Sequence, residues 1–253
     1  MAFDEQAAIA SFWDARARGE YFPHEWFDRL SLDDAYRIQL GLIARRIAAG
    51  ERHIGWKVGL TAPAIQQQFG FHEPVFGCLL ETRPSGHVFR SDELIHPGFE
   101  SELCLHIKEP LSGEVDAAAV RRAIDVVYPA LEIIETRGDL SAQIAVAMAD
   151  NAQQKTNILG TPVPLGTRAL DAVEATVQIN GQTVATGRGD AVLGNPLNSV
   201  IWLARKLTEF GRGIRAGDFI MSGSFTRQFP IAPGDQIRVD FAGIGSVQTS
   251  MGR

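Results

Sequence analysis

Apolar and polar positions near the amino terminus follow the period of an α-helix. Ile38 and Leu42 lie one helical turn apart, and Gly50 follows the last apolar position of the segment. Ser31 stands where an N-cap is expected, with acidic residues just after it and basic residues before Gly50. The pattern predicts that the first fifty residues are helical and that the helix after Ser31 packs by one apolar face.

The pattern changes from residue 54 onward, where short apolar segments lie between closely spaced Gly and Pro residues. Such spacing is typical of strands and tight connections. The run 103–107 predicts a strand, 115–127 returns to a helical period, and 131–135 predicts the next strand. The middle of the chain is therefore expected to form a strand, a helix and a second strand.

After residue 160 the pattern is almost entirely that of strands. Two alternating runs rich in Val and Thr, within 173–187, are joined by Asn180-Gly181, which is a strong signal for a tight hairpin. The segments 218–225 and 235–251 predict three further strands. This part of the chain is expected to be β-structure with at least one hairpin.

One helix interrupts these strands, and with it the organisation of the chain can be stated. Asn195 stands at the N-cap position, Pro196 at the first helical position and Gly211 just after the end. The chain shows no repeat, linker or low-complexity stretch. We expect an N-terminal helical segment at 1–52 and a β-rich domain at 53–253, which carries the candidate chemistry described below.

Composition is that of an ordinary globular protein. The 253 residues are 45% hydrophobic and carry a formal net charge of −6. This mild acidity argues against binding to a nucleic-acid backbone, and no apolar run reaches the roughly 18–20 residues that span a bilayer. Cys78 and Cys104 are too few for a disulfide framework and are expected to be reduced thiols. We therefore expect a cytoplasmic protein with no nucleic-acid partner and no membrane span.

A pair of acidic residues precedes the strand predicted at 103–107. Side chains two apart in a strand point to the same face, so Glu100 and Glu102 would project together. Two like charges so placed repel each other unless a cation lies between them. The pair is harmless if that face meets solvent, and it is a candidate cation site if it does not.

A third carboxylate favours the cation site. Glu132 lies within the apolar run YPALEII, and a buried carboxylate needs a partner. Together with Glu100 and Glu102 it makes an all-oxygen set suited to Mg²⁺ or Mn²⁺. The two Cys and six His show no zinc-ligand spacing. The sequence therefore predicts a divalent-cation site of the hard-metal type.

Other polar residues allow two interpretations each. Lys57, between glycines in GWKVGLT, is either an exposed edge residue or a base and carboxylate binder whose pKa falls on burial. Ser222 and Ser224 flank a glycine and offer hydroxyls to an oxyanion, although Ser-Gly-Ser is also ordinary turn composition. His72-Glu73 is either an acid/base dyad or a loop pair without a role in catalysis. The nucleophile elbow, the Walker loop and a Rossmann fingerprint are all missing from the sequence.

Six segments resemble a known family when they are taken in order. They are GWKVGLT, HPGFESEL, PALEII, MADNA, GRGDAVLGNPLNSVIWLARKL and GDFIMSGS. In combination they resemble the hydratase/decarboxylase branch of the fumarylacetoacetate hydrolase superfamily, from about Ala35 to the carboxy terminus. The resemblance implies an α+β fold, a mixed β-sandwich-like roll around a metal with N-terminal helices beside it.

The resemblance also implies roles for particular residues. Glu100, Glu102 and Glu132 match the Glu-x-Glu pair and the later Glu that bind Mg²⁺ or Mn²⁺ in the family. Lys57 matches the lysine that acts on the enol or carboxylate of the substrate. The segment GSFTR, which ends in Arg227, resembles that of the hydratases that take a seven-carbon diacid. The resemblance implies that this arginine meets the distal carboxylate of the substrate. Ser222, Ser224 and Arg227 are accordingly expected to bind substrate.

Three positions depart from the family pattern. Val75 stands where hydratases often carry Asp, and an apolar residue there is more similar to the oxalocrotonate decarboxylases. Gly98 and Phe99 replace the basic residue often found before the Glu-x-Glu pair, and Asn195 replaces a common histidine. These departures bear on which substrate is used and which reaction follows.

The resemblance implies a metal-dependent lyase in the degradation of aromatic compounds. The first expectation is a hydratase that adds water to a 2-hydroxy-2,4-dienoate or 2-oxo-enoate, such as 2-oxopent-4-enoate or 2-oxohept-4-enedioate. The alternative is a decarboxylase of 2-oxo-3-hexenedioate (4-oxalocrotonate). A hydrolase of the C–C bond of an acylpyruvate ranks third, and a binding protein without catalysis is the hypothesis from another class. The expected partner is this small molecule; we expect a homo-oligomer and leave open a complex with a related pathway enzyme.

Overall fold

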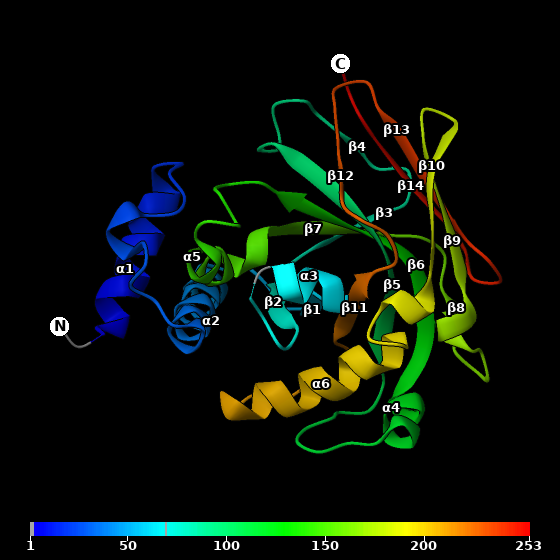
Figure 1. Ribbon diagram of the computed structural model, residues 1–253, viewed down its shortest axis with the longest axis horizontal. Helices are drawn as coiled ribbons and strands as arrows, with labels where there is room; N and C mark the ends of the chain where they lie inside the picture. Colours follow the sequence, from blue (N-terminus) through cyan, green and yellow to red (C-terminus); the bar gives the residue numbers. More distant parts are fainter. Residues whose placement is uncertain (1–2, 69) are drawn as a thin grey trace.

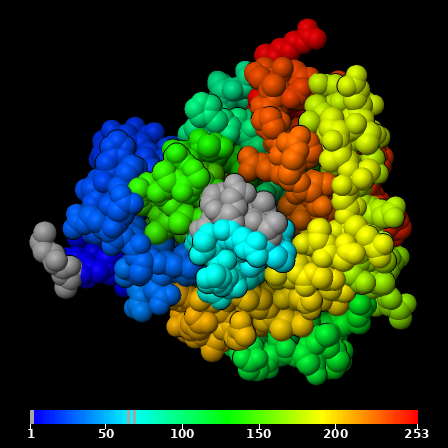
Figure 2. All heavy atoms as spheres, viewed as in Figure 1, coloured from blue at the N-terminus to red at the C-terminus, as the bar shows by residue number. Residues whose placement is uncertain are grey.

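Two β-sheets that pack face to face carry most of the protein, and the helices lie beside them (Figure 1). The computed structural model describes residues 3–68 and 70–253. Figure 2 shows the blue N-terminal helices at one end of the molecule and the yellow and red strands of the smaller sheet at the other. The predicted combination of N-terminal helices and a β-rich remainder is confirmed.

The larger sheet is mixed. Its strands follow the order β2 (Val75–Leu79), β1 (Gly55–Gly59), β11 (Phe219–Ser224), β5 (Pro97–Ile107), β6 (Ile124–Glu135), β7 (Gln154–Leu159) and β3 (Thr82–Pro84). Two short strands add to it, β12 (Phe229–Pro230) beside β5 and β8 (Val163–Pro164) beside β6. The pairs β1–β11 and β3–β7 are parallel, and the other pairs are antiparallel.

The smaller sheet is built from the carboxy-terminal part of the chain and one short strand from the first half. Its order is β10 (Gln182–Arg188), β9 (Glu174–Ile179), β13 (Gln236–Phe241), β14 (Gly245–Met251) and β4 (Val88–Phe89). Asn180 and Gly181 join β9 to β10 with φ of 53° and 78°, the two positive values that a tight hairpin turn of this kind requires. The predicted hairpin and the three predicted carboxy-terminal strands, β11, β13 and β14, are confirmed.

The helices are α1 (Glu5–Ala17), α2 (Leu32–Ala48), α3 (Pro63–Gln68), α4 (Ala117–Ala123), α5 (Ile144–Ala149) and α6 (Pro196–Glu209). Four single 3₁₀ turns accompany them, η1 (His24–Trp26), η2 (Asn151–Gln153), η3 (Leu170–Ala172) and η4 (Gly189–Ala191). Among the residues that the structure describes, none of these helices has both the length and the apolar character needed to cross a membrane.

Both predicted N-caps are present. The Ser31 hydroxyl accepts a hydrogen bond from Asp34 N, and the Asp34 carboxylate accepts one from Ser31 N, which forms a reciprocal capping box. Asn195 Oδ1 accepts from Leu197 N at 2.9 Å, and Asn195 Nδ2 donates to Asp171 Oδ1. Asn195, a departure from the family pattern, therefore caps α6 and ties it to η3.

Three predicted boundaries were wrong. The helix expected over 115–127 ends at Ala123, and Ile124 already begins β6, so the strand expected at 131–135 is the end of a twelve-residue strand. Val127 pairs with Leu105 of β5, so sheet pairing overrides the helical period there. The strand expected at 103–107 begins at Pro97 and therefore includes the acidic pair.

The main hydrophobic core lies between the two sheets. It joins Leu103 and Leu131 of the larger sheet to Val177 and Val239 of the smaller sheet. The N-terminal helices share in this core, because Tyr36 of α2 stacks on Phe76 of β2 with ring centroids 4.1 Å apart. A division of the chain at 52/53 thus separates elements that bury side chains together, and it stays a prediction.

The larger sheet curls so that its two ends approach each other. The side chain of Asn151, in η2 just before β7, lies against β2 at the far end of the sheet order. Its Oδ1 accepts from Cys78 N at 2.7 Å, and its Nδ2 donates to Cys78 O at 2.9 Å. The side-chain amide of Asn151 thus bonds to the backbone of β2 as a residue of a neighbouring strand would, and it joins the two ends of the curled sheet. The concave face so formed is lined at one end by a small buried cluster from four strands: Leu79, Cys104, Ala130 and Met221.

Close backbone packing beside β1 gives a first testable prediction. Gly55 has φ of 152°, and a Cβ there would lie 1.9 Å from the carbonyl oxygen of Phe219 in β11. Gly55→Ala should lower the free energy of unfolding by more than about 2 kcal/mol, because backbone atoms on both strands would have to move. Chemical denaturation measures the change. Gly113→Ala is the control: its φ is also positive but nothing lies within 4 Å, so it should cost only about 1 kcal/mol. Equal losses would contradict the prediction.

Candidate metal centre

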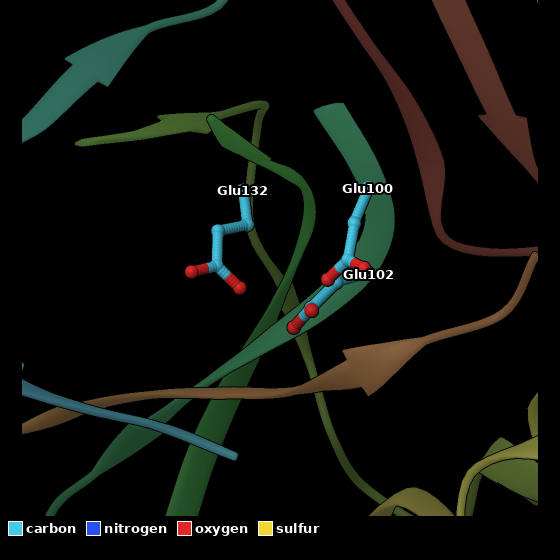
Figure 3. A group of neighbouring side chains, drawn as sticks. All are labelled: Glu100, Glu102 and Glu132. Atoms are coloured by element: carbon cyan, nitrogen blue, oxygen red, sulfur yellow. The ribbon is translucent and has the colours of Figure 1, made fainter. Parts of the chain in front are cut away.

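Three carboxylates meet on the concave face of the larger sheet. Glu100 and Glu102 lie two apart in β5, and Glu132 of β6 is directly opposite Glu100 in the strand register. One carboxylate oxygen from each residue lies within 4.8 Å of the others, and Figure 3 shows the three side chains projecting into the same space. The structure thus brings together the three residues that the sequence predicted. They come from two neighbouring antiparallel strands, β5 and β6.

Most of the oxygens in this group have no hydrogen-bond donor. Glu102 and Glu132 are fully buried, and Glu100 is partly buried. Within the residues that the structure describes, Glu102 Oε1 and Glu132 Oε2 accept no hydrogen bond, and Glu132 Oε1 faces the ammonium group of Lys57. Glu102 Oε2 accepts one from Gly223 N at 2.9 Å. Orphaned carboxylate oxygens that face one another in a dry interior fit a hard divalent cation such as Mg²⁺ or Mn²⁺.

The carboxyl groups hold protons more tightly than usual when no cation lies between them. Burial raises the pKa of Glu100 to about 7, and repulsion from Glu132 acts in the same direction. Burial and the two neighbouring carboxylates raise the pKa of Glu102 well above its ordinary value. Burial also raises the pKa of Glu132, although Lys57 opposes it. The metal-free site therefore takes up protons around neutral pH.

Lys57 of β1 points into the same group. Its Nζ lies 3.2 Å from Glu132 Oε1, and only 7% of its side chain is exposed. Burial by itself would lower the pKa of Lys57, but attraction to Glu132 and the other two carboxylates outweighs it, so the pKa lies above its ordinary value. The structure places Lys57 in the interior beside a carboxylate, and not at an exposed edge. Its action on a substrate stays a prediction, and the expected fall of its pKa does not occur in the metal-free protein.

Two glycines make room for this lysine. Gly77 lies opposite Lys57 in the register of β1 and β2, and a Cβ on Gly77 would come within 3.2 Å of the Cγ and Cε atoms of Lys57. A Cβ on Gly59 would lie 3.4 Å from Lys57 Nζ and equally far from Cγ2 of Val75. Val75 and Lys57 therefore both border the space above Gly59, as diagonal neighbours on one face of β1 and β2.

The Ser-Gly-Ser segment acts on the site through its backbone. β11 has a register irregularity between Met221 and Ser224, and Gly223 within it has φ of 113° and donates its N–H to Glu102. Ser222 is fully buried and its Oγ has no partner among the described residues, while Ser224 Oγ donates to Ser101 O at 3.4 Å. A substrate contact by either hydroxyl stays a prediction.

The structure does not bring Arg227 to the carboxylates. The side chain is exposed, its Nη1 donates to Gln228 O, and the guanidinium lies 4.1 Å from the ring centroid of Phe229. Phe229 pairs with Phe99, which alternates with Glu100 and so faces the opposite side of β5. The role of Arg227 toward a distal carboxylate is a prediction that this conformation leaves untested.

The adjacent pair His72-Glu73 is engaged elsewhere. Glu73 accepts hydrogen bonds from Lys206 Nζ at 2.9 Å and from Trp202 Nε1 at 3.4 Å, both on α6. Its carboxylate therefore ties the loop before β2 to α6, and the structure favours the interpretation as a loop pair without a role in catalysis.

Two polar residues at the site were missed in the sequence. Asn157 of β7 lies directly opposite Glu132, is fully buried, and its Oδ1 has no partner in the described part of the chain. Gln154, also on β7, is almost fully buried and leaves its Nε2 without a partner there. The MADNA motif pointed to this segment, but the chemistry of the two amides depends on strand register, which the sequence does not reveal.

Fold and site together define an α+β protein with a cluster of three carboxylates that fits a divalent cation, and with a buried lysine paired with one of them. The model described as fumarylacetoacetate (FAA) hydrolase C-terminal matches residues 80–251. The chain belongs to the fumarylacetoacetate hydrolase family, as its motifs suggested, and the expected fold of that family is confirmed.

Relatives of this chain include both kinds of lyase. It is 38% identical over 252 residues to a 2-keto-4-pentenoate hydratase of Paraburkholderia xenovorans (strain LB400), covering 96% of this chain and 93% of that protein. It is 37% identical over 226 residues to a 4-oxalocrotonate decarboxylase of Pseudomonas putida, covering 87% and 86%. The 4-oxalocrotonate decarboxylase from Pseudomonas putida G7, solved in complex with magnesium and adipate, superposes with a TM-score of 0.92 at 33% identity over 99% of each chain.

The raised carboxyl pKa values predict how a cation stabilises this protein. Without metal, the folded state retains protons that the unfolded state has released above about pH 4.5, so this contribution to stability is lost as the pH rises through about 7. The increase in Tm on adding Mg²⁺ or Mn²⁺ should therefore be small near pH 5 and large near pH 8. Thermal melts with chelator and with metal measure it.

A variant and its control make this prediction specific to the site. Glu132→Gln should abolish most of the metal-dependent increase in Tm, whereas Glu109→Gln, at an exposed position, should keep it. A normal metal response in Glu132→Gln would show that the cation binds elsewhere.

Proposed function

We propose that this protein is a divalent-metal-dependent lyase that adds water to a 2-hydroxy-2,4-dienoate or its 2-oxo-enoate tautomer. The observation that carries the proposal is a trio of carboxylates, most of whose oxygens lack a hydrogen-bond donor among the described residues, with the ammonium group of a buried lysine 3.2 Å from one of them. Relatives named as 2-keto-4-pentenoate and 2-hydroxypent-2,4-dienoate hydratases support the reaction class.

Glu100, Glu102 and Glu132 would hold Mg²⁺ or Mn²⁺, which supplies a Lewis acid for the carboxylate and C2 oxygen of a 2-oxo acid. Lys57 would orient the substrate, because its charged Nζ can donate a hydrogen bond to a substrate oxygen. The same Nζ can hold the proton that moves during tautomerisation, before water adds at C4. Both roles require the lysine to be close to the carboxylates, as it is.

The concave face keeps water away from one side of this chemistry. The cluster of Leu79, Cys104, Ala130 and Met221 is fully buried on the face that carries the carboxylates. Apolar side chains here exclude solvent from the inner side of the substrate and strengthen the attraction between Lys57 and a substrate anion.

Decarboxylation of a 2-oxo-3-enedioate is the second candidate, and Val75 favours it. This residue is 1% exposed and lies beside the lysine, where an acidic residue would provide a proton donor or a site for water. The relatives named as 4-oxalocrotonate decarboxylases support this alternative as well. An acylpyruvate hydrolase ranks third, because Glu73, its candidate base, is bound to α6.

Further parts of the proposal concern the setting of the enzyme. We propose that the enzyme acts in the degradation of aromatic compounds, in the cytoplasm and as a homo-oligomer. Ser222, Ser224 and Arg227 would bind the substrate. Both cysteines are buried and unpaired, as expected of a protein in a reducing compartment.

The deciding experiment measures both reactions on the same metal-loaded protein. Ultraviolet absorbance follows the loss of 2-hydroxypenta-2,4-dienoate, its diacid homologues and 2-oxo-3-hexenedioate, while released CO₂ is measured in parallel. Loss of the dienoate chromophore without CO₂ is the expected result. Stoichiometric CO₂ from the enedioate would assign the decarboxylase instead. Absence of turnover with Mg²⁺ and with Mn²⁺ would favour a binding protein and refute the lyase.

Lys57→Met tests the role of the lysine. The substitution keeps the length of the side chain but removes the charge, so turnover should fall by about two or more orders of magnitude. Metal affinity should be kept, since the three carboxylates remain. Steady-state kinetics and calorimetric titration of Mn²⁺ measure the two quantities. Turnover close to that of the wild type would assign Lys57 a purely structural role.

Arg227→Met tests recognition of a second carboxylate. If Arg227 swings toward the substrate, the variant should lose about tenfold or more in kcat/KM for a dicarboxylic 2-oxo-enoate and little for the monoacid, because a charge-assisted contact is made only by the diacid. Equal loss on both substrates, or no loss on either, would remove Arg227 from the substrate-binding residues.

A further inference from the structure

The segment that leads into β7 is held in an unfavourable backbone conformation. Asn151, Ala152 and Gln153 have φ of 59°, 49° and 60°, so three consecutive residues with side chains form one left-handed turn. L-residues avoid this conformation, and runs of it are rare. Such a turn persists only where its surroundings enforce it, and strain of this kind is found where a site needs one particular geometry.

A buried arginine grips the turn at both ends. Arg137 exposes only 3% of its side chain and pairs with the carboxylates of Asp150 and Glu135. Its Nη2 donates to Asp150 O at 2.8 Å, before the turn. Its Nη1 lies 3.4 Å from the carbonyl oxygen of Gln153, the last residue of the turn, and 3.5 Å from that of Gln154, the residue after it. One guanidinium therefore binds carbonyl groups at both ends of the strained segment.

The turn is also fastened across the curl of the sheet. The two hydrogen bonds between the Asn151 side chain and Cys78 of β2 hold it there, and a Cβ on Gly77 would lie 3.2 Å from Asn151 O. The same Cβ would lie 3.2 Å from the stem of Lys57. The turn and the stem of the lysine thus both lie close to Gly77.

The residue that this arrangement positions is Gln154. It is the first residue of β7 and pairs with Ile134, which lies two residues after Glu132 and so shares its face. The side chain is almost completely buried, and its Oε1 lies 3.5 Å from Asn151 Nδ2. Its Nε2 donates to no atom among the residues that the structure describes. An amide whose acceptor end is held and whose buried donor end is left unpaired is suited to a ligand that brings an acceptor.

We propose that Gln154 Nε2 donates a hydrogen bond to the C1 carboxylate of the substrate, and that Arg137 and Asn151 position it through the left-handed turn. The assignment rests on the proposed function, because a 2-oxo acid would place its C1 carboxylate at the carboxylates and Lys57. Gln154 shares the face of the carboxylates, whereas Arg227 stacks on Phe229, whose partner Phe99 faces the opposite side of β5. Gln154 is then a substrate-binding residue, and Arg137 is a positioning residue.

Oxalate is the probe that isolates this contact, since it carries the C1 carboxylate and an adjacent C2 oxygen of a 2-oxo acid and has no carbon beyond C2. Calorimetry titrates oxalate into the Mn²⁺-loaded full-length protein, and kinetics follow the dienoate in parallel. Gln154→Met keeps the shape of the side chain and removes the donor. It should weaken oxalate binding and raise KM by about tenfold or more, with Mn²⁺ affinity and Tm unchanged.

A matched control lies on the same strand. Thr156 is also buried with an unpartnered Oγ1, but it pairs with Ile133 and so faces away from the carboxylates. Thr156→Val should leave oxalate affinity and KM as in the wild type. If Gln154→Met lowers Tm or metal affinity, Gln154→Glu serves instead, because a carboxylate at this position repels oxalate and must weaken its binding.

The outcomes separate this proposal from the proposed function. Unchanged oxalate affinity in a folded Gln154 variant overturns the assignment alone. A loss confined to dicarboxylic substrates, with oxalate unaffected, also overturns it, because Gln154 would then contact the far end. Failure of the wild-type protein to bind oxalate with either metal overturns the proposed function and this assignment with it.

A double-mutant cycle tests the positioning role of Arg137. Arg137→Lys keeps the charge but cannot reach both ends of the turn, so it should weaken oxalate binding in the wild-type background and add little in Gln154→Met. Additive losses would show that Arg137 acts independently of Gln154.

Discussion

Three carboxylates that face one another in a nearly dry interior are the constraint on which this structure depends. Glu100, Glu102 and Glu132 carry more negative charge than Lys57 can balance, and most of their oxygens lack a donor within the described residues. Uncompensated buried charge is costly, so the group is stable only with protons or with a cation. The raised pKa values of the carboxyl groups and their fit to a divalent ion are two consequences of this one imbalance.

The fold creates that environment by curling one sheet and covering its convex side with another. The register of β5 and β6 brings Glu132 opposite Glu100, while the parallel pairing of β1 with β11 brings Lys57 to the same face. Two polar contacts complete the arrangement. Gly223 N donates a hydrogen bond to Glu102, and the side-chain amide of Asn151 joins the two ends of the curled sheet. The site is therefore assembled from segments that lie far apart in the sequence.

The proposed roles would let one scaffold suit several reactions. In the proposal, the carboxylates and Lys57 would serve any reaction that passes through an enolate, and the residues around them would select among these reactions. The surrounding positions differ in character: Val75 offers an apolar wall beside the lysine, and Gln154 offers a free donor on β7. Relatives of similar identity are named as hydratases and as decarboxylases, in keeping with a choice of reaction made by few residues.

Local chemistry determined what the sequence could predict. Ser31 and Asn195 cap helices through atoms two or three residues away, Asn180-Gly181 turns a hairpin by its own backbone preferences, and alternation along β5 makes the acidic pair share a face. The apolar run around Glu132 added the third carboxylate, and the motifs added the family. Only the tertiary structure decided that the helix stops at Ala123, that Lys57 is buried with a raised pKa, and that Gln154 shares the face of the carboxylates. Those features depend on strand pairing and burial between distant segments, and short-range preferences carry no information about which segments will meet.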